Sequence, residues 1–224
     1  MKKSLLIFAA LVLSACERTP VVNVDGEKLA GMYVEDGKVA AFLGVPYAEP
    51  PVGDFRWRAP QPLSTFVAKR EVTEFAPACI QSMRILDWYR GLAEDLGGTA
   101  AYYDDLEISE DCLYLNIWTP TLEEDAKLPV MVWVHGGSNK SGWSYEPNYY
   151  GHMLAQQGVV VVSVAYRQGV FGFLSHPELS RDEPVANFGY WDLIKSLHWI
   201  QGSIEQFGGD PDRVTMFGES AGAE

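Results

Sequence analysis

VTMFGESAG, at residues 214–222, is a short apolar run that leads directly into Gly-x-Ser-x-Gly. This spacing is that of a nucleophile elbow, in which a serine stands at the tip of a sharp strand-to-helix turn. The turn forces the serine into a strained backbone conformation, and side chains on its neighbours would clash. Gly218 and Gly222 therefore flank Ser220, the candidate nucleophile. Because glycine and serine are common in loops, the pattern needs support from its context.

The context is a resemblance to a known family. Residues 207–222, FGGDPDRVTMFGESAG, resemble the serine signature of the type-B carboxylesterases, a family of α/β-hydrolases that includes the cholinesterases. Residues 110–116, EDCLYLN, resemble the second signature of that family. The resemblance runs from about Val22 to Glu224. It implies an α/β-hydrolase fold with a mostly parallel central sheet and flanking helices, and hydrolysis of small carboxylic esters through a serine acyl-enzyme.

In that family the triad acid and histidine follow the serine along the chain. The resemblance therefore implies that both lie beyond Glu224, and that residues 21–224 are the N-terminal portion of one hydrolase domain. We expect the full-length protein to be a serine carboxylesterase. We expect the chain as given to be inactive and poorly folded, because its last strand is left as an exposed apolar edge. The alternative is a non-catalytic binding module, against which the complete elbow argues.

Composition narrows the classes of partner. The chain is 47% hydrophobic, which fits a globular core, and it carries 17 Lys and Arg against 30 Asp and Glu, for a net charge of −13. It lacks the basic cluster that a duplex-binding surface needs, so nucleic acid is not an expected partner. The acidity is typical of a solvated surface. The resemblance implies neither a metal nor an organic cofactor.

The N-terminus is typical of a targeting segment. MKK precedes an apolar run at residues 5–13 that is too short for an ordinary transmembrane helix. LSAC, at residues 13–16, resembles the lipobox of bacterial lipoproteins, which implies cleavage before Cys16 and acyl chains on it. We interpret residues 1–15 as a signal peptide and 16–20 as a tether, anchored in the outer membrane because Glu17 follows the cysteine. The alternative is an ordinary secretory signal.

Cys79 and Cys112 remain after Cys16 is assigned to the signal. In an exported chain an even pair suits a disulfide, and the family has a bridge at these positions. Free buried thiols are the alternative. The family also implies an ion pair between Arg56 and Glu110, the alternative being two separately solvated side chains.

The loop between the two cysteines is the least family-like part of the chain. Residues 83–92 have apolar side chains near helical spacing, which predicts a short helix. In the family this loop contributes to the wall of the substrate gorge. Its aromatic residues are therefore candidate substrate contacts, with core or rim packing as the alternative for each. They are Trp88, Tyr89, Tyr102 and Tyr103.

A second glycine-rich turn follows a predicted strand at residues 128–135, whose VMVWV run indicates burial on both faces. HGGS, at residues 135–138, resembles the His-Gly-Gly-Gly element that supplies backbone N–H groups to an oxyanion hole. The resemblance implies donors at Gly137, Ser138 and Ala221, with Gly136 shaping the turn. Ser138 departs from the third glycine, and its Cβ narrows the space there. His135 is expected to be structural, and Glu219 to support the site.

The remaining pattern alternates helices and strands. We predict strands at residues 113–119 and 159–166, a helix at 147–157, and a helix that Asn187 caps and that runs to about residue 207. This alternation with buried strands argues for a parallel α/β sheet. The site then lies at the carboxyl ends of the strands, where HGGS and Ser220 both fall.

Overall fold

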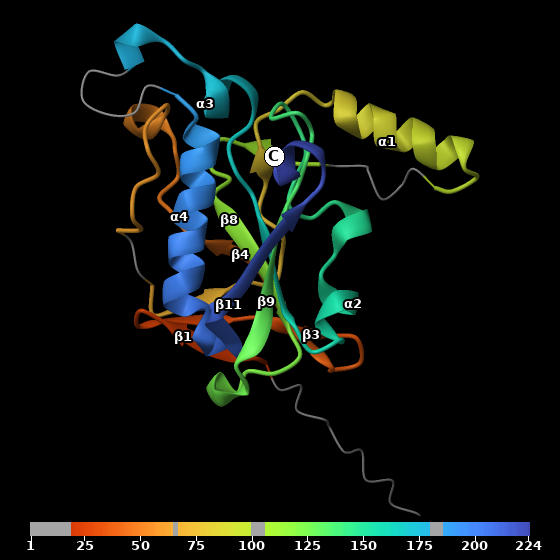
Figure 1. The fold of residues 1–224 in the computed structure, drawn as a ribbon, viewed down its shortest axis with the longest axis vertical. Helices are drawn as coiled ribbons and strands as arrows, with labels where there is room; N and C mark the ends of the chain where they lie inside the picture. The colour runs from red at the N-terminus through yellow and green to blue at the C-terminus, as the bar shows by residue number, and fades with distance from the viewer. Residues whose placement is uncertain (1–18, 65–66, 100–105, 180–185) are drawn as a thin grey trace, which may run out of the picture.

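The structure is a computed structural model that describes residues 19–64, 67–99, 106–179 and 186–224. Its centre is a six-stranded sheet in the order β11-β9-β10-β8-β4-β3 (Figure 1). The strands are β3 Met32–Val34, β4 Val39–Pro46, β8 Tyr114–Thr119, β9 Leu128–Val134, β10 Val160–Val164 and β11 Gly209–Gly218. Cys16, Tyr102, Tyr103 and the predicted signal lie outside the described residues.

The sheet is parallel on one side and antiparallel on the other. β11 and β10 both run parallel to β9, whereas β8 is antiparallel to β10, β4 to β8, and β3 to β4. Strands β11, β9, β10 and β4 therefore run in the same direction, but three of the five pairings are antiparallel, so the described sheet is mixed rather than mostly parallel. The carboxyl ends of β9 and β11 come to the same edge, because Gly218 pairs with Val134.

Two helical layers cover the sheet, one on each face (Figure 1). Alternate residues of β10 face opposite ways: Val162 lies in one core cluster with Ile200 and Phe207, and Val161 lies in another with Ala155. The first cluster packs under α4 (Phe188–Ser203) and the short η6 (Ile204–Phe207), and the second under α2 (His152–Ala155). Burial on both faces explains why these strands are nearly continuous apolar runs.

Smaller elements surround the main sheet. A three-stranded sheet joins β1 (Val21–Val24), β2 (Glu27–Ala30) and β5 (Lys69–Glu71), and a two-stranded one joins β6 (Ala78–Cys79) and β7 (Ile108–Ser109). The remaining α-helices are α1 (Arg84–Asp95) and α3 (Gly169–Phe173). Short 3-10 turns are η1 Gly53–Phe55, η3 Glu124–Ala126, η4 Pro147–Tyr149, η5 Pro177–Leu179 and η7 Ser220–Ala223.

The second signature, residues 110–116, connects several segments of the fold. Arg56 forms the predicted ion pair with Glu110, with both hydrogen bonds at 2.5 Å, so that prediction is confirmed. Cys112 forms the predicted disulfide with Cys79. Asn116, which is buried, accepts from the N–H of Gly44 and donates to two serine hydroxyls, so its amide joins β4, β10 and the segment after β9.

Two local predictions are wrong. The helix predicted at residues 147–157 breaks into η4 and α2, because Tyr150 between them is extended, with ψ 127°, and its ring lies against Phe75. Gly151 leaves no room for a side chain there, since a Cβ would come 2.5 Å from Trp118. Asn187 does precede α4, but it adopts a left-handed conformation with φ 64° and makes no side-chain cap.

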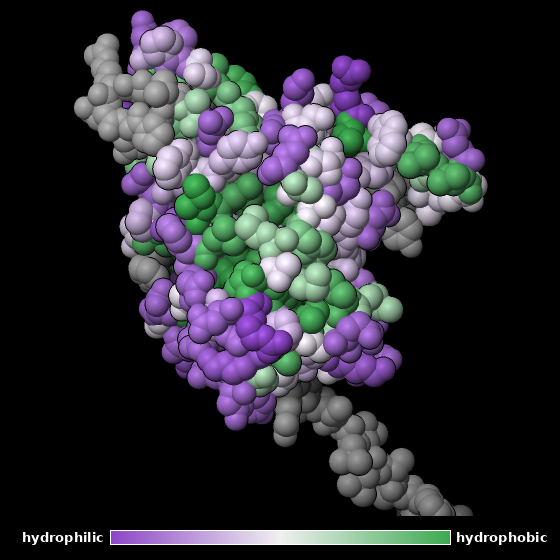
Figure 2. Space-filling model, in the orientation of Figure 1, coloured by the Kyte–Doolittle hydropathy of each residue, from purple (hydrophilic) through white to green (hydrophobic). Residues whose placement is uncertain are grey.

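β11 is an edge strand in the described part of the chain. It pairs with β9 alone among the described strands, and Met216 is 46% exposed. Figure 2 shows apolar residues gathered on the face over β11, between α4 and α2. Across the residues that the structure describes, no helix combines the length and apolarity needed to cross a membrane.

Candidate active site

Ser220 lies at the tip of the turn that follows β11, at the start of η7. It has φ 51°, a left-handed conformation that is uncommon for serine and that indicates local strain. The N–H of Gly222 donates to the carbonyl of Glu219 at 2.8 Å and closes the turn. The Ser220 side chain is exposed. This is the geometry that the Gly-x-Ser-x-Gly pattern predicts.

The two flanking glycines are required by backbone that passes close to them. A Cβ on Gly218 would come 2.3 Å from the carbonyl oxygen of Gly222, and a Cβ on Gly222 would come 2.2 Å from that of Val134. Both distances are far below any van der Waals contact. We call residues 218–222 the elbow; it packs directly on the end of β9.

The turn after β9, residues 136–142, lies against the elbow, and we call it the glycine loop. A Cβ on Gly136 would come 3.0 Å from the Cβ of Ser220 and 2.3 Å from a carboxylate oxygen of Glu219. Only glycine permits this approach. Three consecutive residues then have left-handed backbone: Gly137 with φ 101°, Ser138 with φ 57° and Asn139 with φ 58°. The glycine loop and the nucleophile therefore face each other, as the sequence motifs predict.

His135 is not placed to act as a base for Ser220. It is buried, its ring stacks on Tyr166 with centroids 4.6 Å apart, and its Nδ1 lies 2.9 Å from the carbonyl of Gly136. This contact fits a neutral ring that carries its proton on Nδ1. Burial lowers the pKa of His135 to about 4, which the Gly136 carbonyl partly opposes. His135 fills the space behind the glycine loop.

A cavity of about 390 Å³ opens in front of Ser220. Its walls come from α1, the glycine loop, the segment after it and the elbow. The predicted residues that line it are Trp88, Tyr89, Gly136, Gly137, Ser138, Glu219 and Ser220. Ala221 is buried beside it in η7. The described lining holds two carboxylates, Glu146 and Glu219, and no histidine, lysine or arginine. A larger cavity lies along residues 19–20 and 31–37, and its lining includes no residue of these motifs.

Helix α1 forms one wall of this cavity. Only Leu86 is buried among its residues, whereas Trp88 is 57% exposed at the cavity. Tyr89 is held by contacts on two sides: its ring packs edge-on against Trp143, and its hydroxyl donates to Glu146 at 2.6 Å. Substrate contact is therefore sterically open to both predicted residues that the structure describes.

Glu146 is a buried acid at the site that the sequence motifs do not reveal. It is 4% exposed and also accepts from the N–H of Trp143. Burial raises the pKa of Glu146; the hydrogen bonds from Tyr89 and Trp143 oppose this shift, and the charge of Glu219 adds to it. Glu219 itself is exposed, with its carboxylate against Gly136, so its supporting role stays a prediction. A single glutamate before Pro147 gives no sequence signal for the role of Glu146.

Comparison with known proteins agrees with this geometry. The model of the carboxylesterase family matches residues 18–224. The chain belongs to the carboxylesterase family. The fumonisin B1 esterase of Sphingopyxis macrogoltabida is 47% identical over 84% of this chain and 33% of its own length. The liver carboxylesterase of Sus scrofa is 42% identical over 92% of this chain and 36% of its own.

Solved structures of carboxylesterase-type enzymes share the fold. A thermophilic pNB esterase superposes with a TM-score of 0.78 at 38% identity, covering 92% of this chain and 39% of that one. The carboxylesterase of Geobacillus stearothermophilus superposes with a TM-score of 0.73 at 36% identity, with the same two coverages. The α/β-hydrolase fold is thereby confirmed. The chain spans about a third of the length of the curated relatives it matches.

Proposed function

We propose that the full-length protein hydrolyses carboxylic esters through a covalent acyl-enzyme on Ser220. The observation that carries the proposal is the strained, exposed Ser220 at the elbow, which lies directly against Gly136 at the wall of the cavity. Family membership supports ester hydrolysis in general. The backbone N–H groups of Gly137, Ser138 and Ala221 are the proposed oxyanion donors.

In the proposed reaction the Ser220 hydroxyl oxygen attacks the ester carbonyl, and a histidine takes its proton. The carbonyl oxygen becomes an oxyanion that the three N–H groups stabilise, each worth roughly 10²–10³ in rate. The C–O bond to the alcohol breaks, and the histidine returns the proton to the leaving alkoxide. Water then attacks the acyl-enzyme, releases the acid and restores the hydroxyl. We place the histidine and its acid in the part of the protein outside this chain.

The test uses the full-length protein with a fluorophosphonate probe and p-nitrophenyl esters. We expect covalent labelling at Ser220, identified by peptide mass, and turnover of the esters. Ser220→Ala should abolish both. Ser196→Ala is the control, because the Ser196 hydroxyl donates to the carbonyl of Leu193 within α4. Absence of labelling and turnover in a folded wild-type protein would sink the proposal.

We further propose that the protein is exported and anchored by lipid on Cys16. The motif at residues 13–16 and the disulfide, which suits an oxidising compartment, support this. Metabolic labelling with an alkyne fatty acid is the test. Label in the wild-type protein and none in Cys16→Ser is the expected result, and equal label in the two would contradict it.

A further inference from the structure

The backbone of the glycine loop is strained. Ser138 and Asn139 hold left-handed conformations in succession, directly after Gly137. Asparagine tolerates this region better than most residues, but serine does not share that advantage. Such conformations are energetically unfavourable and persist only where the surroundings hold them. The loop therefore needs contacts from outside itself.

Few bonds hold the loop from within. The N–H groups of Lys140 and Ser141 donate to the carbonyl of Gly137 at 3.0 and 3.2 Å. Besides the His135 contact with the carbonyl of Gly136, an outside contact reaches its middle: the N–H of Gly169 donates to the carbonyl of Asn139 at 2.7 Å. A further outside contact reaches its far end, at Gly142, and comes from a side chain.

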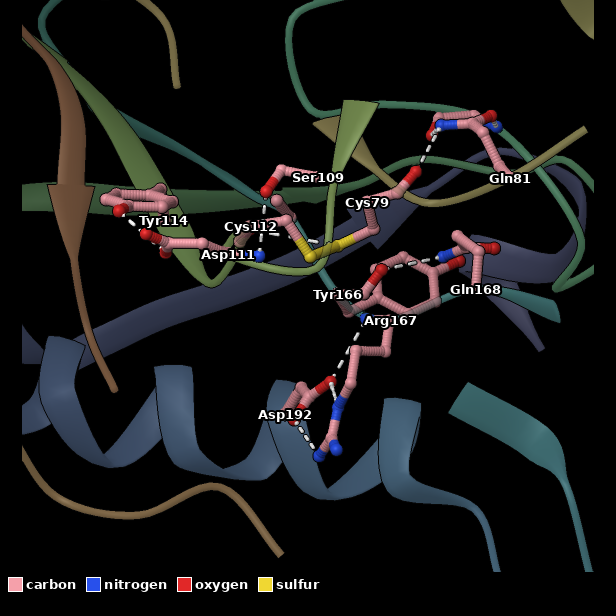
Figure 3. Close-up of a disulfide and its surroundings, with 12 residues drawn as sticks. Cys79, Gln81, Ser109, Asp111, Cys112, Tyr114, Tyr166, Arg167, Gln168 and Asp192 are labelled. Atoms are coloured by element: carbon pink, nitrogen blue, oxygen red, sulfur yellow. Dashed lines mark hydrogen bonds and ion pairs between the residues drawn. A yellow bond between two sulfur atoms is a disulfide. The ribbon is translucent and has the colours of Figure 1, made fainter. Parts of the chain in front are cut away.

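That side chain is Gln81, two residues after Cys79. Its amide forms a closed pair with the backbone of Gly142: Nε2 donates to the carbonyl at 2.8 Å, and Oε1 accepts from the N–H at 2.6 Å. Nε2 also donates to the carbonyl of Cys79 at 3.1 Å, as Figure 3 shows. Gln81 thus connects Cys79, which the disulfide links to Cys112, with the end of the glycine loop.

The position of Gly142 is coupled to the start of the loop. A Cβ on Gly142 would come 2.4 Å from Nδ1 of His135 and 2.5 Å from the carbonyl oxygen of Gly136. Its φ of 104° is itself one that side chains rarely adopt. Because Gly142 lies directly on His135 and Gly136, a displacement at Gly142 changes the backbone that leads into Gly137 and Ser138.

We propose that Gln81 is a positioning residue for the oxyanion hole. It acts through Gly142, holding the strained glycine loop so that the N–H groups of Gly137 and Ser138 face Ser220. The inference rests on the proposed esterase function for its kinetic consequence only. Its structural part, that Gln81 restrains residues 137–142, stands independently of any activity.

The experiment replaces Gln81 in the full-length protein. Gln81→Leu removes both hydrogen bonds to Gly142 at similar volume. We expect kcat per active site to fall about 10- to 100-fold with KM little changed, because a misplaced donor is lost mainly in the transition state. Active sites are counted by end-point titration with the fluorophosphonate. Affinity for a trifluoromethyl ketone, a transition-state analogue, should weaken in parallel with kcat/KM.

Two further variants keep the test sharp. Gln81→Glu retains size and the acceptor for the Gly142 N–H, and should lie between wild type and Gln81→Leu. Ser138→Gly relieves the backbone strain at residue 138. Gln81→Leu should therefore lower kcat by a smaller factor in the Ser138→Gly background than in wild type. Gln201→Leu is the matched control, since Gln201 also donates to a backbone carbonyl, that of Pro211, away from the site. It should leave kcat and KM unchanged.

Amide hydrogen exchange separates the two proposals. We expect faster exchange at residues 137–142 in Gln81→Leu than in wild type or Gln201→Leu. Unchanged exchange together with unchanged kcat would overturn the inference while leaving the esterase proposal intact. If wild type neither turns over esters nor takes the fluorophosphonate, the esterase proposal fails. The exchange comparison then still decides whether Gln81 restrains the loop.

Discussion

The elbow after β11 and the glycine loop after β9 meet at one edge of the sheet, and both contain left-handed residues, yet different neighbours hold them. The elbow packs on the backbone of the adjacent strand, where Val134 excludes any side chain at Gly222. The glycine loop is held by groups distant in sequence, namely Gln81 and the N–H of Gly169. The conformation of the elbow follows from a local motif and from strand pairing. The conformation of the glycine loop depends on how three separate segments of the chain assemble.

We expect the largest effect from the ion pair of Arg167, because it anchors the segment whose Gly169 N–H contacts the glycine loop. Arg167 and Asp192 form a buried pair, with three hydrogen bonds of 2.7–3.0 Å from Arg167 to the carboxylate (Figure 3). Burial raises the pKa of Asp192, and Arg167 opposes that shift. Asp192→Ala leaves the buried Arg167 cation without its carboxylate partner and should lower the free energy of unfolding by about 3–5 kcal/mol. Denaturant titration measures this.

The control for that pair is an exposed one. Glu71, with 63% of its side chain exposed, pairs with Lys69 at 2.6 Å. Glu71→Ala should leave the unfolding midpoint unchanged, because solvent screens such pairs. A result in which Asp192→Ala is equally silent would show that the segment after β10 does not depend on α4.

The disulfide should be next in size. Cys79 and Cys112 are separated by 33 residues, and on the chain-entropy model the bridge is worth roughly 3–4 kcal/mol of unfolding free energy. Replacing both with serine should therefore destabilise the protein by about that amount. It should also raise amide exchange in the glycine loop more than in the elbow, since Gln81 is tied to Cys79. Equal changes in both turns would contradict the distinction drawn between them.

A single added methyl group at Gly222 should disrupt the elbow. Gly222→Ala puts a Cβ against the carbonyl oxygens of Val134 and His135, at 2.2 and 2.6 Å, which only backbone movement can relieve. We expect a loss of about 2–3 kcal/mol in thermal or denaturant unfolding, together with loss of fluorophosphonate labelling. Gly202→Ala is the matched control: it lies in α4 with open space around the added Cβ, and should be neutral or stabilising.

The smallest expected effect is a pH dependence shared by both turns through His135. Its pKa is about 4 in the folded protein, below the ordinary 6.5, so the unfolded chain binds a proton first as the pH falls. Stability should drop by about 1.5 kcal/mol between pH 6.5 and pH 5 from this group. Glu146, whose pKa is raised, acts in the opposite direction. His135→Gln keeps Glu146 and should flatten the slope; an unchanged slope would refute the assignment.

Much of the site could be predicted from the sequence because its geometry depends on glycine. Neighbouring atoms lie so close to three glycines that a side chain would clash: these are Gly136, Gly218 and Gly222. A position that excludes side chains appears in the sequence as a glycine at a fixed spacing. The apolar strands and the disulfide, which the family resemblance implied, were likewise predicted and are confirmed. The extended Tyr150 was not, because its ring packs against Phe75, far away in the sequence.

The sequence by itself determined the family, the order of the strands along the chain, and the two turns that face each other. The family resemblance also implied that the loop carrying α1 lines the site. Only the tertiary structure decided that Glu146 is buried beside the cavity and that Gln81 holds Gly142. The reason is physical. A glycine is required where neighbouring atoms leave no room for a side chain, and a short sequence motif is enough to identify such a position. The partners of the Glu146 carboxylate and the Gln81 amide depend on which distant segments come together, and no local sequence pattern identifies them.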